Sequence, residues 1–134
     1  MAALDARFEA TDLTGKIIGC AMKVHTSLGS GFQEMVYQRA LEIEFQDSGM
    51  SFVREYELPI QYKQKRIGGR RVDFLVAERI PVELKAIVTL ENMLLAQAMN
   101  YLEAYNLKTG MLINFGSPRL QYHRLTNKKF RSAE

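Results

Sequence analysis

The stretch at residues 70–86 reads RRVDFLVAERIPVELKA, and the rest of the chain is arranged around it. It holds two apolar runs rich in strand-forming residues, 72–77 and 80–88, on either side of a polar step at residues 78–79. Two such runs around a short polar step predict a β-hairpin. Strand alternation then gives this hairpin an apolar face that can enter a core, formed by Val72, Phe74, Val76, Val82 and Leu84.

Two acids and a lysine fall on the opposite face of the predicted hairpin. With the turn centred on Glu78, Asp73 and Glu83 lie equally far from it and therefore face each other. Opposed residues of an antiparallel pair project to one face, with Cβ atoms roughly 4.5–5.5 Å apart. Lys85 follows Glu83 by two residues and shares that face by strand alternation.

Two interpretations of this polar face are open. A solvated face is the ordinary one, since cross-strand pairs of opposite charge stabilise sheets by about 0.2–1 kcal/mol. However, Asp73 and Glu83 repel each other by about 1 kcal/mol in water, or ~4 kcal/mol at the effective dielectric of a protein surface. We therefore expect a raised pKa for at least one of them, and no loss of metal-free stability in Asp73→Ala. A Mg²⁺ ion, which binds one or two carboxylates plus water and phosphate, fits the two acids better.

Three motifs in chain order carry a resemblance to a known family. Asp73 followed after nine residues by Glu83-Leu84-Lys85 resembles the PD-(D/E)XK signature of the restriction-endonuclease-like nuclease superfamily. The stretch GFQEMVY at residues 31–37 resembles the motif of the GxxExxY proteins, a branch of that superfamily. The stretch QAMNY at residues 97–101 is similar to the QxxxY motif of RecB-like nucleases. The resemblance spans residues 17–130.

The resemblance implies an α/β (α+β) fold with a restriction-endonuclease-like αβββαβ core, in which helices flank a mixed central sheet. It implies a Mg²⁺- or Mn²⁺-dependent nuclease in which Asp73, Glu83 and the backbone carbonyl of Leu84 hold one or two ions. Lys85 would orient the attacking water, and the metal would lower the pKa of that water. One departure is Val72, which stands where the name of the signature has proline.

Glu34 opens a predicted helix, with Tyr37 and Gln38 on the same helix face by their i, i+3 and i+4 spacing. A plain explanation of Glu34 is its interaction with the helix dipole, worth about 0.3–1 kcal/mol. The resemblance instead implies that Glu34 is a further catalytic acid, bound to the metal directly or through water. Tyr37 is then a candidate for substrate contact.

Gln97 and Tyr101 lie at i and i+4 of another predicted helix. Core packing explains Tyr101, but a buried glutamine needs hydrogen-bond partners. The resemblance implies that both side chains lie over the mouth of the active site, where they contact phosphate or base and Gln97 assists catalysis. Arg71 is a further candidate for substrate contact.

Length and composition indicate one domain over residues 1–134, with a flexible arm at residues 1–11, which lack periodicity. No apolar run is long enough to span a membrane, and the first residues lack the apolar stretch of a signal peptide. The single cysteine, Cys20, excludes an internal disulfide and a cysteine metal cluster. We therefore expect a cytoplasmic protein.

Charge is divided unevenly along the chain. Residues 1–57 carry a net charge of −4 and residues 58–134 a net charge of +7. A basic surface favours nucleic acid through counterion release, although lysines also keep a small domain soluble. We expect a nucleic-acid partner, DNA rather than RNA, and a homodimer would help so small a domain to grip a duplex.

Helix and strand patterns predict the order α-α-β-β-β-α-β-β. The expected ranges are helices over residues 14–28 (capped by Asp12 or Thr14), 33–47 and 91–105, and strands over 52–62, 72–77, 80–86, 109–115 and 120–125. A basic turn with two glycines is expected over residues 63–71; no helix follows it, so it is not a phosphate-binding loop. His25 is open to two interpretations, as a core or surface histidine or as the metal ligand that some RecB-like nucleases carry.

A second function remains open beside the nuclease. The chain could be a catalytically silent module that binds nucleic acid or protein and keeps the fold. The acid–acid–lysine set argues for catalysis, because a silent module has no need to hold like charges together. The sequence leaves open the strandedness of the substrate, any sequence preference, endo- or exonuclease action, the oligomeric state and the pathway.

Overall fold

The computed structural model describes residues 10–132, which form three helices and five strands in the predicted order. The helices are α2 (Ala10–Leu28), α3 (Glu34–Asp47) and α4 (Asn92–Ala104). The strands are β1 (Phe52–Tyr62), β2 (Lys65–Val76), β3 (Ile80–Lys85), β4 (Thr109–Asn114) and β5 (Gln121–Thr126). None of these helices is long and apolar enough to cross a membrane.

All five strands belong to one sheet, in the order β1-β2-β3-β4-β5. β3 and β4 are parallel, and the other neighbouring strands are antiparallel. Parallel neighbours need a crossover connection, which α4 supplies between β3 and β4. The expected fold class, a mixed sheet flanked by helices, is confirmed.

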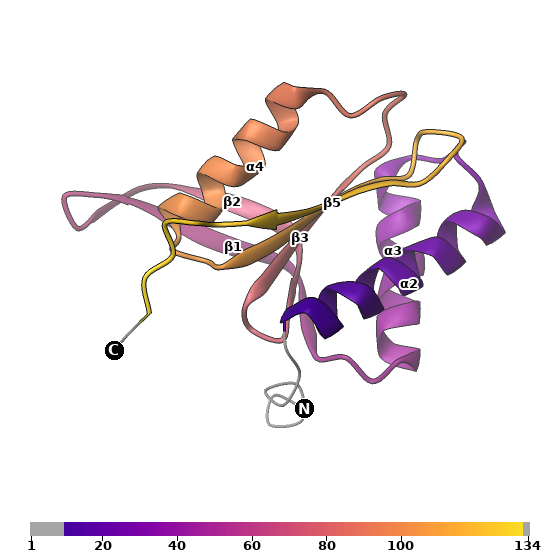
Figure 1. The fold of residues 1–134 in the computed structure, drawn as a ribbon, viewed down its shortest axis with the longest axis horizontal. Coiled ribbons are helices and arrows are strands. Elements are labelled where there is room, and N and C mark those ends of the chain that lie inside the picture. The colour runs from indigo at the N-terminus through magenta and orange to yellow at the C-terminus, as the bar shows by residue number, and fades with distance from the viewer. Residues whose placement is uncertain (1–9, 133–134) are drawn as a thin grey trace.

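Helices cover both faces of the sheet (Figure 1). α2 and α3 pack on one face in the larger core, which includes Met111 and Ile113 of β4. The intervening residue Leu112 belongs to a smaller core with Leu102 of α4. Because Glu83 pairs with Leu112 across the parallel strands, its side chain projects to the α4 side of the sheet.

The predicted hairpin is present, with its turn where the sequence placed it. β2 and β3 pair residue 74 with 82 and residue 76 with 80, so that the register is centred on residue 78. Ala77 and Glu78 have φ angles of 53° and 60°, and the Arg79 N–H donates to the Val76 carbonyl over 3.1 Å. Two successive positive φ angles are typical of a type I′ turn, whose twist matches that of the flanking strands.

β2 is longer than expected, because the basic turn predicted over residues 63–71 is confined to residues 63–64, with φ angles of 49° and 67°. Glycines weaken strands, which is why the sequence favoured a loop there. In the structure both glycines pair with β1. A Cβ atom on Gly69 would lie 2.9 Å from both Arg66 Nη2 and Glu57 Oε1, so glycine leaves room for the ion pair of these two residues.

The first helix begins earlier than expected. The flexible arm predicted over residues 1–11 lies outside the described residues, except for its last two residues, which belong to α2. Asp12 therefore lies inside the first turn, and neither Asp12 nor Thr14 caps the helix. Thr14 is fully buried, and its hydroxyl accepts a hydrogen bond from Arg124 Nε over 2.7 Å.

Val72 does not share a core with Phe74, although strand alternation predicts it. Phe74 lies in the larger core, whereas Val72 lines a small cavity with Tyr101 of α4. Between them, Asp73 lies opposite Glu55, whose φ angle of 56° interrupts the pairing of β1 with β2. The pairing of β2 with β3 also ends at Phe74. The direction in which the side chains project therefore changes along β2 at Asp73. As a result, Val72 faces α4, whereas Phe74 faces α2 and α3.

Candidate active site

The candidate active site is a cleft of about 320 Å³ that begins where β2 stops pairing with β3. Its lining comes from α3, β1, β2 and β3. The cleft brings together six of the residues singled out from the sequence, namely Glu34, Arg71, Asp73, Glu83, Leu84 and Lys85.

Asp73 is held by a donor on each carboxylate oxygen. Gln38 of α3 donates to Oδ1 over 2.9 Å, and the backbone N–H of Leu84 donates to Oδ2 over 2.8 Å. These bonds fix the carboxylate between α3 and β3 at the point where the strand turns. Each oxygen keeps a second lone pair, so Asp73 can bind an ion without losing either bond.

Glu83 is less well satisfied. Its Oε2 atom lies 2.6 Å from Nη2 of Arg70, while its Oε1 atom is buried and has no hydrogen-bond partner within residues 10–132. Burial raises the pKa of Glu83 to about 7; Arg70 opposes this shift and Asp73 adds to it. The expected raised pKa is confirmed, but burial rather than repulsion between the acids is its main cause.

Unsatisfied polar atoms gather in this cleft. Among the described residues, three buried side-chain atoms have no hydrogen-bond partner: Gln38 Oε1, Arg70 Nε and Glu83 Oε1. All three belong to residues that line the cleft. Such atoms are costly to leave unpaired, and their concentration in one place is typical of a site that awaits another component.

Lys85 and Glu34 complete the charges of the cleft. Within residues 10–132, the Lys85 ammonium makes no hydrogen bond or ion pair, although it lowers the pKa of Glu83. Glu34 is exposed at the first turn of α3 and helps to raise that pKa. Glu34 thus reaches the cleft from a distant part of the chain, as the resemblance implied.

Sequence reasoning missed two residues of the site. Gln38 was placed on the helix face of Glu34 but given no role, and Arg70 was noted only as part of a basic turn. The signal for Gln38 was its position four residues after an acid at the cleft. For Arg70 no local signal separates it from its neighbour Arg71, since the choice depends on the path of β2.

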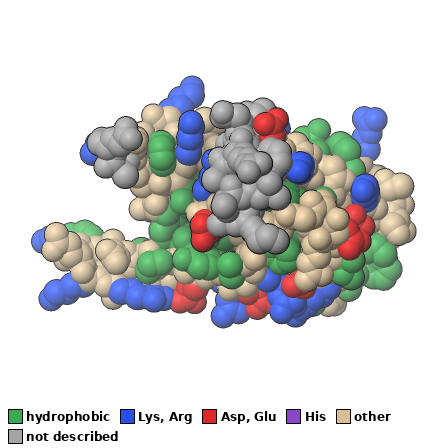
Figure 2. Space-filling view, turned by 90° about the horizontal axis from the view of Figure 1, so that it is seen from below, with side chains coloured by type: hydrophobic (Ala, Val, Ile, Leu, Met, Phe, Trp, Pro, Cys, Tyr) green, Lys and Arg blue, Asp and Glu red, His purple; other side chains and the backbone are tan. Residues whose placement is uncertain are grey.

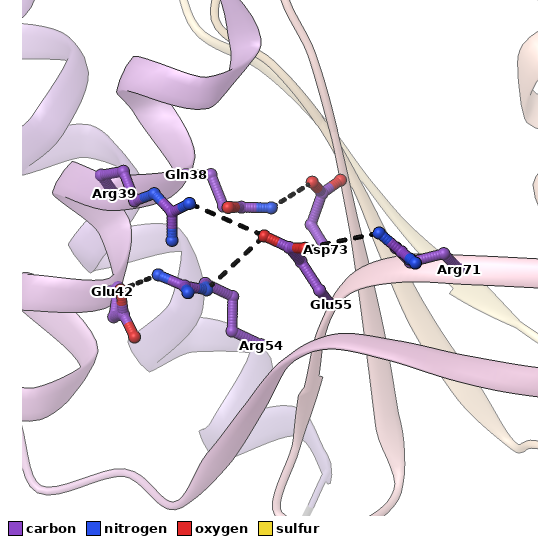
Figure 3. Close-up of polar contacts among 7 residues, drawn as sticks. All are labelled: Gln38, Arg39, Glu42, Arg54, Glu55, Arg71 and Asp73. Carbon is purple, nitrogen blue, oxygen red and sulfur yellow. Dashed lines mark hydrogen bonds and ion pairs between the residues drawn. The ribbon is translucent and has the colours of Figure 1, made fainter.

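A second charged cluster lies beside Asp73, on the other side of β2 from Glu83 (Figure 3). Glu55 lies at its centre, and nitrogen atoms of three arginines, Arg39, Arg54 and Arg71, lie 3.5–3.8 Å from its carboxylate oxygens. Arg54 also contacts Glu42 over 2.8 Å. The cluster carries more positive than negative charge and borders the cleft, since Glu55 and Arg71 both line it.

Tyr37 is fully buried and stacks on Phe115. Its hydroxyl donates to the Gly29 carbonyl over 2.6 Å and accepts from the Phe32 N–H over 3.1 Å. The structure therefore places Tyr37 in the core, with its polar atom occupied by the turn that precedes α3. Its burial leaves no surface for contact with a substrate.

Gln97 is exposed on α4 and does not line the cleft. The expectation that a buried glutamine needs partners therefore does not apply to it. Tyr101 lies one turn later, with the guanidinium of Arg70 4.4 Å from its ring centroid. Tyr101 also lines the small cavity beneath α4 that includes Glu83. The structure thus connects Tyr101 to the site through Arg70.

His25 lies away from the cleft. Its Nε2 atom is 3.0 Å from the backbone oxygen of Ser117, and its ring lies near Phe115. Among the described residues, the lining of the hollow beside His25 contains Arg119 but no carboxylate. The structural interpretation of His25 is thus favoured over metal ligation.

The donor set of the cleft fits a hard divalent cation. Within residues 10–132, no group of three or more His, Cys, Asp or Glu side chains gathers into a preformed metal cage. Mg²⁺ does not need a cage of three or more protein ligands, since it keeps several waters and binds one or two carboxylates plus phosphate. Asp73 and Glu83 meet this need, and the unpartnered Oε1 of Glu83 offers a ligand atom that no protein group occupies.

Comparison with known proteins agrees with this geometry. A family model described as the PD-(D/E)XK nuclease superfamily matches residues 11–125, which include the whole cleft. Comparisons with curated proteins and with solved structures found no match. The family match extends over most of the chain, and the chain therefore belongs to the PD-(D/E)XK nuclease superfamily.

Proposed function

We propose that this protein is a Mg²⁺- or Mn²⁺-dependent nuclease that hydrolyses phosphodiester bonds, acts on DNA in preference to RNA, and works in the cytoplasm. Membership of the superfamily supports nuclease activity. The observation that carries the proposal is the cleft that holds Asp73, Glu83 and an unpaired Lys85 together among the described residues.

In this proposal Asp73, Glu83 and the backbone carbonyl of Leu84 hold the metal, and Glu34 assists directly or through water. The bound ion supplies a lowered pKa for its water and neutralises charge on the phosphate. Lys85 orients the attacking water and offsets the charge that develops on the phosphate oxygens. Its ammonium has no competing partner within residues 10–132, so it can turn toward the substrate.

Tyr37 takes a positioning role rather than the direct substrate contact that the resemblance suggested. Its hydroxyl joins Gly29 and Phe32 on the turn that leads into α3. Glu34 is the first residue of that helix. Tyr37 therefore sets where Glu34 enters the cleft. This link supports placing the chain in the GxxExxY branch of the superfamily.

Substrate contacts in the proposal come from three places. Arg71 lies at the edge of the cleft, and Gln97 and Tyr101 lie on α4. Beyond the cleft, β1 and β2 continue as a two-stranded ribbon whose tip carries exposed basic residues, including Lys63 and Lys65. Figure 2 shows Lys and Arg side chains along the narrow projection at the lower left, where this ribbon lies. Such a ribbon can follow a phosphate backbone.

A cleavage screen tests the proposal. Labelled single- and double-stranded DNA and RNA are incubated with the protein and Mg²⁺ or Mn²⁺, alongside Asp73→Asn and a chelator control. We expect metal-dependent cleavage of DNA by the natural sequence and none by Asp73→Asn. The proposal fails if no substrate is cut and millimolar Mn²⁺ does not raise the melting temperature, because an ion bound only by the folded state must stabilise it.

The alternative is a silent module that binds nucleic acid or protein. It predicts binding of labelled nucleic acid that needs no divalent ion and does not change in Asp73→Asn. Sedimentation of the protein with and without a DNA duplex would show whether a homodimer forms on the substrate.

A further inference from the structure

Arg70 and Glu83 form the most enclosed ion pair of the described residues. Their side chains are 27% and 12% exposed, and Nη2 of Arg70 lies 2.6 Å from Oε2 of Glu83. The guanidinium also lies over the Tyr101 ring, 4.4 Å from its centroid. Arg70 is thus held from two sides, by an acid of the candidate metal site and by an aromatic ring of α4.

The pair is only partly satisfied. Arg70 Nε and Glu83 Oε1 are both buried, and neither has a hydrogen-bond partner in the part of the chain that the structure describes. Arginine–carboxylate pairs are frequently bidentate, with two parallel hydrogen bonds that add both energy and geometric specificity. Here the pair makes one contact, and each partner, both of which line the cleft, keeps a buried polar atom with no hydrogen-bond partner among the described residues. This geometry suits a pair that can be exchanged for other partners.

We propose that Arg70 is a resident counter-cation that occupies Glu83 in the metal-free cleft and is replaced there by the divalent ion. The inference rests on the proposed metal-dependent function and adds a residue that sets the metal affinity. The Glu83 side chain is only 12% exposed, so its ionised form needs a cation nearby in either state. Arg70 supplies that cation without metal, and the metal supplies it once bound.

Competition follows from charge. A guanidinium and a divalent ion on the same carboxylate repel each other, and the low dielectric of a buried site strengthens this repulsion. The metal must therefore weaken the Arg70–Glu83 contact to bind well. The Tyr101 ring gives the displaced guanidinium a place to remain by a cation–π interaction. Arg70 thus weakens metal binding, and it compensates the charge of Glu83 when no metal is bound.

Isothermal titration with Mn²⁺ tests the competition without any activity measurement. Arg70→Gln removes the counter-cation, and Arg71→Gln is the matched control, since Arg71 is the adjacent residue with the same charge but pairs with Glu55. Titrations at pH 8.5 limit competition from protons at Glu83, whose pKa is about 7. We expect Arg70→Gln to bind Mn²⁺ at least tenfold more tightly than the natural sequence, and Arg71→Gln to differ by less than threefold.

Three other outcomes distinguish failure of the counter-cation role from failure of the proposed nuclease function. If the natural sequence binds Mn²⁺ and Arg70→Gln binds it equally or more weakly, the counter-cation role is overturned while the proposed nuclease stands. If Mn²⁺ binds to Arg70→Gln but not to the natural sequence, the role is supported in its strongest form. If neither protein binds Mn²⁺, the proposed metal-dependent function fails, and this inference fails with it.

A measurement on the natural sequence covers the case in which Arg70→Gln does not fold. The Nε–H signals of arginine side chains are recorded by NMR during a titration with Mg²⁺, and the Arg70 signal is assigned through Arg70→Lys. We expect saturation with Mg²⁺ to shift the Arg70 signal and to leave the Arg124 signal, which comes from a side chain bonded to Thr14, unchanged. An unchanged Arg70 signal at saturation overturns the proposal.

Discussion

Two acid–arginine clusters lie on either side of Asp73, and they differ in their access to water. Glu83 and Arg70 are 12% and 27% exposed and make one contact of 2.6 Å. Glu55 is 32% exposed, and its contacts to three arginines are longer, at 3.5–3.8 Å. The same pair of residue types therefore forms a buried site in one place and a solvated charged rim in the other.

The comparison shows how burial changes the pKa of an acid in an ion pair and the contribution of the pair to stability. In the inner cluster, burial raises the pKa of Glu83 even though an arginine is in contact with it. In the outer cluster, water and salt screen the charges, and exposed pairs of this kind contribute about 0–1 kcal/mol each. We expect chemistry in the inner cluster and attraction of phosphate at the outer one. Four predictions test this division.

The largest effect is expected at Lys85, the cation of the inner site that has no ion-pair partner among residues 10–132. Lys85→Met should lower kcat by about 10²–10³-fold, the usual cost of removing one group that stabilises transition-state charge. Metal binding should survive, because Lys85 is not a proposed ligand. Single-turnover cleavage and the Mn²⁺-dependent rise in melting temperature measure the two properties. Loss of both together would show that Lys85 supports the metal rather than the reaction.

The second prediction concerns pH and the buried acid. Glu83 has a folded pKa of about 7 against an ordinary value of 4.5, so the folded state binds its proton more tightly. Its favourable contribution is complete below pH 4.5 and is lost as the pH rises through 7, a change of up to about 3 kcal/mol. Urea unfolding of metal-free protein at pH 5 and pH 8 measures it.

Glu83→Gln is the control for this pH dependence. It removes the titrating group but keeps the size of the side chain. The free energy of unfolding of Glu83→Gln, relative to the natural sequence, should rise between pH 5 and pH 8. Parallel pH profiles for the two proteins would contradict the assigned burial of Glu83.

The third prediction corrects an expectation from the sequence. Repulsion between two facing acids suggested that Asp73→Ala would leave metal-free stability unchanged. The structure shows that Asp73 accepts hydrogen bonds from Gln38 and from the Leu84 N–H. Asp73→Ala leaves both donors unpaired and should cost about 1–3 kcal/mol.

Asp73→Asn is the matched variant for that measurement. Its amide can accept from the Leu84 N–H and donate to the unpartnered Oε1 of Gln38 once the Gln38 amide is flipped. It should therefore be more stable than Asp73→Ala in urea unfolding with a chelator present. Equal midpoints for the two variants would mean that the hydrogen bonds of Asp73 carry no net stability.

The smallest effect is expected in the outer cluster. Glu55→Gln should change the free energy of unfolding by less than about 1 kcal/mol, because two of the three arginines around Glu55 are exposed and the third is partly exposed. It leaves the rim more positive, so binding of a DNA duplex should tighten slightly at low salt and return to normal at high salt. Fluorescence anisotropy at two salt concentrations measures this change. A loss of stability as large as that at Asp73 would remove the distinction between the two clusters.

Much of the fold was predictable because its signals are local. The hairpin turn at residue 78, the order of elements and β1 over residues 52–62 follow from apolar runs and polar steps. The errors lie where tertiary contacts override local preference. Gly68 and Gly69 favour a turn by themselves, yet pairing with β1 holds them in a strand.

The candidate site likewise has some features that could be predicted from the sequence and others that could not. That Asp73, Glu83 and Lys85 share a hairpin could be predicted from the sequence alone, because alternation and a short turn leave little freedom over so few residues. Three further features became known only from the folded chain: Gln38 holds Asp73, Tyr37 is buried, and Arg70 rather than Arg71 contacts Glu83. The last of these depends on the path of β2 at Asp73, where its pairing with β1 is interrupted and its pairing with β3 stops. These strands are neighbours in the chain, but no local sequence pattern marks the residue at which their pairing stops.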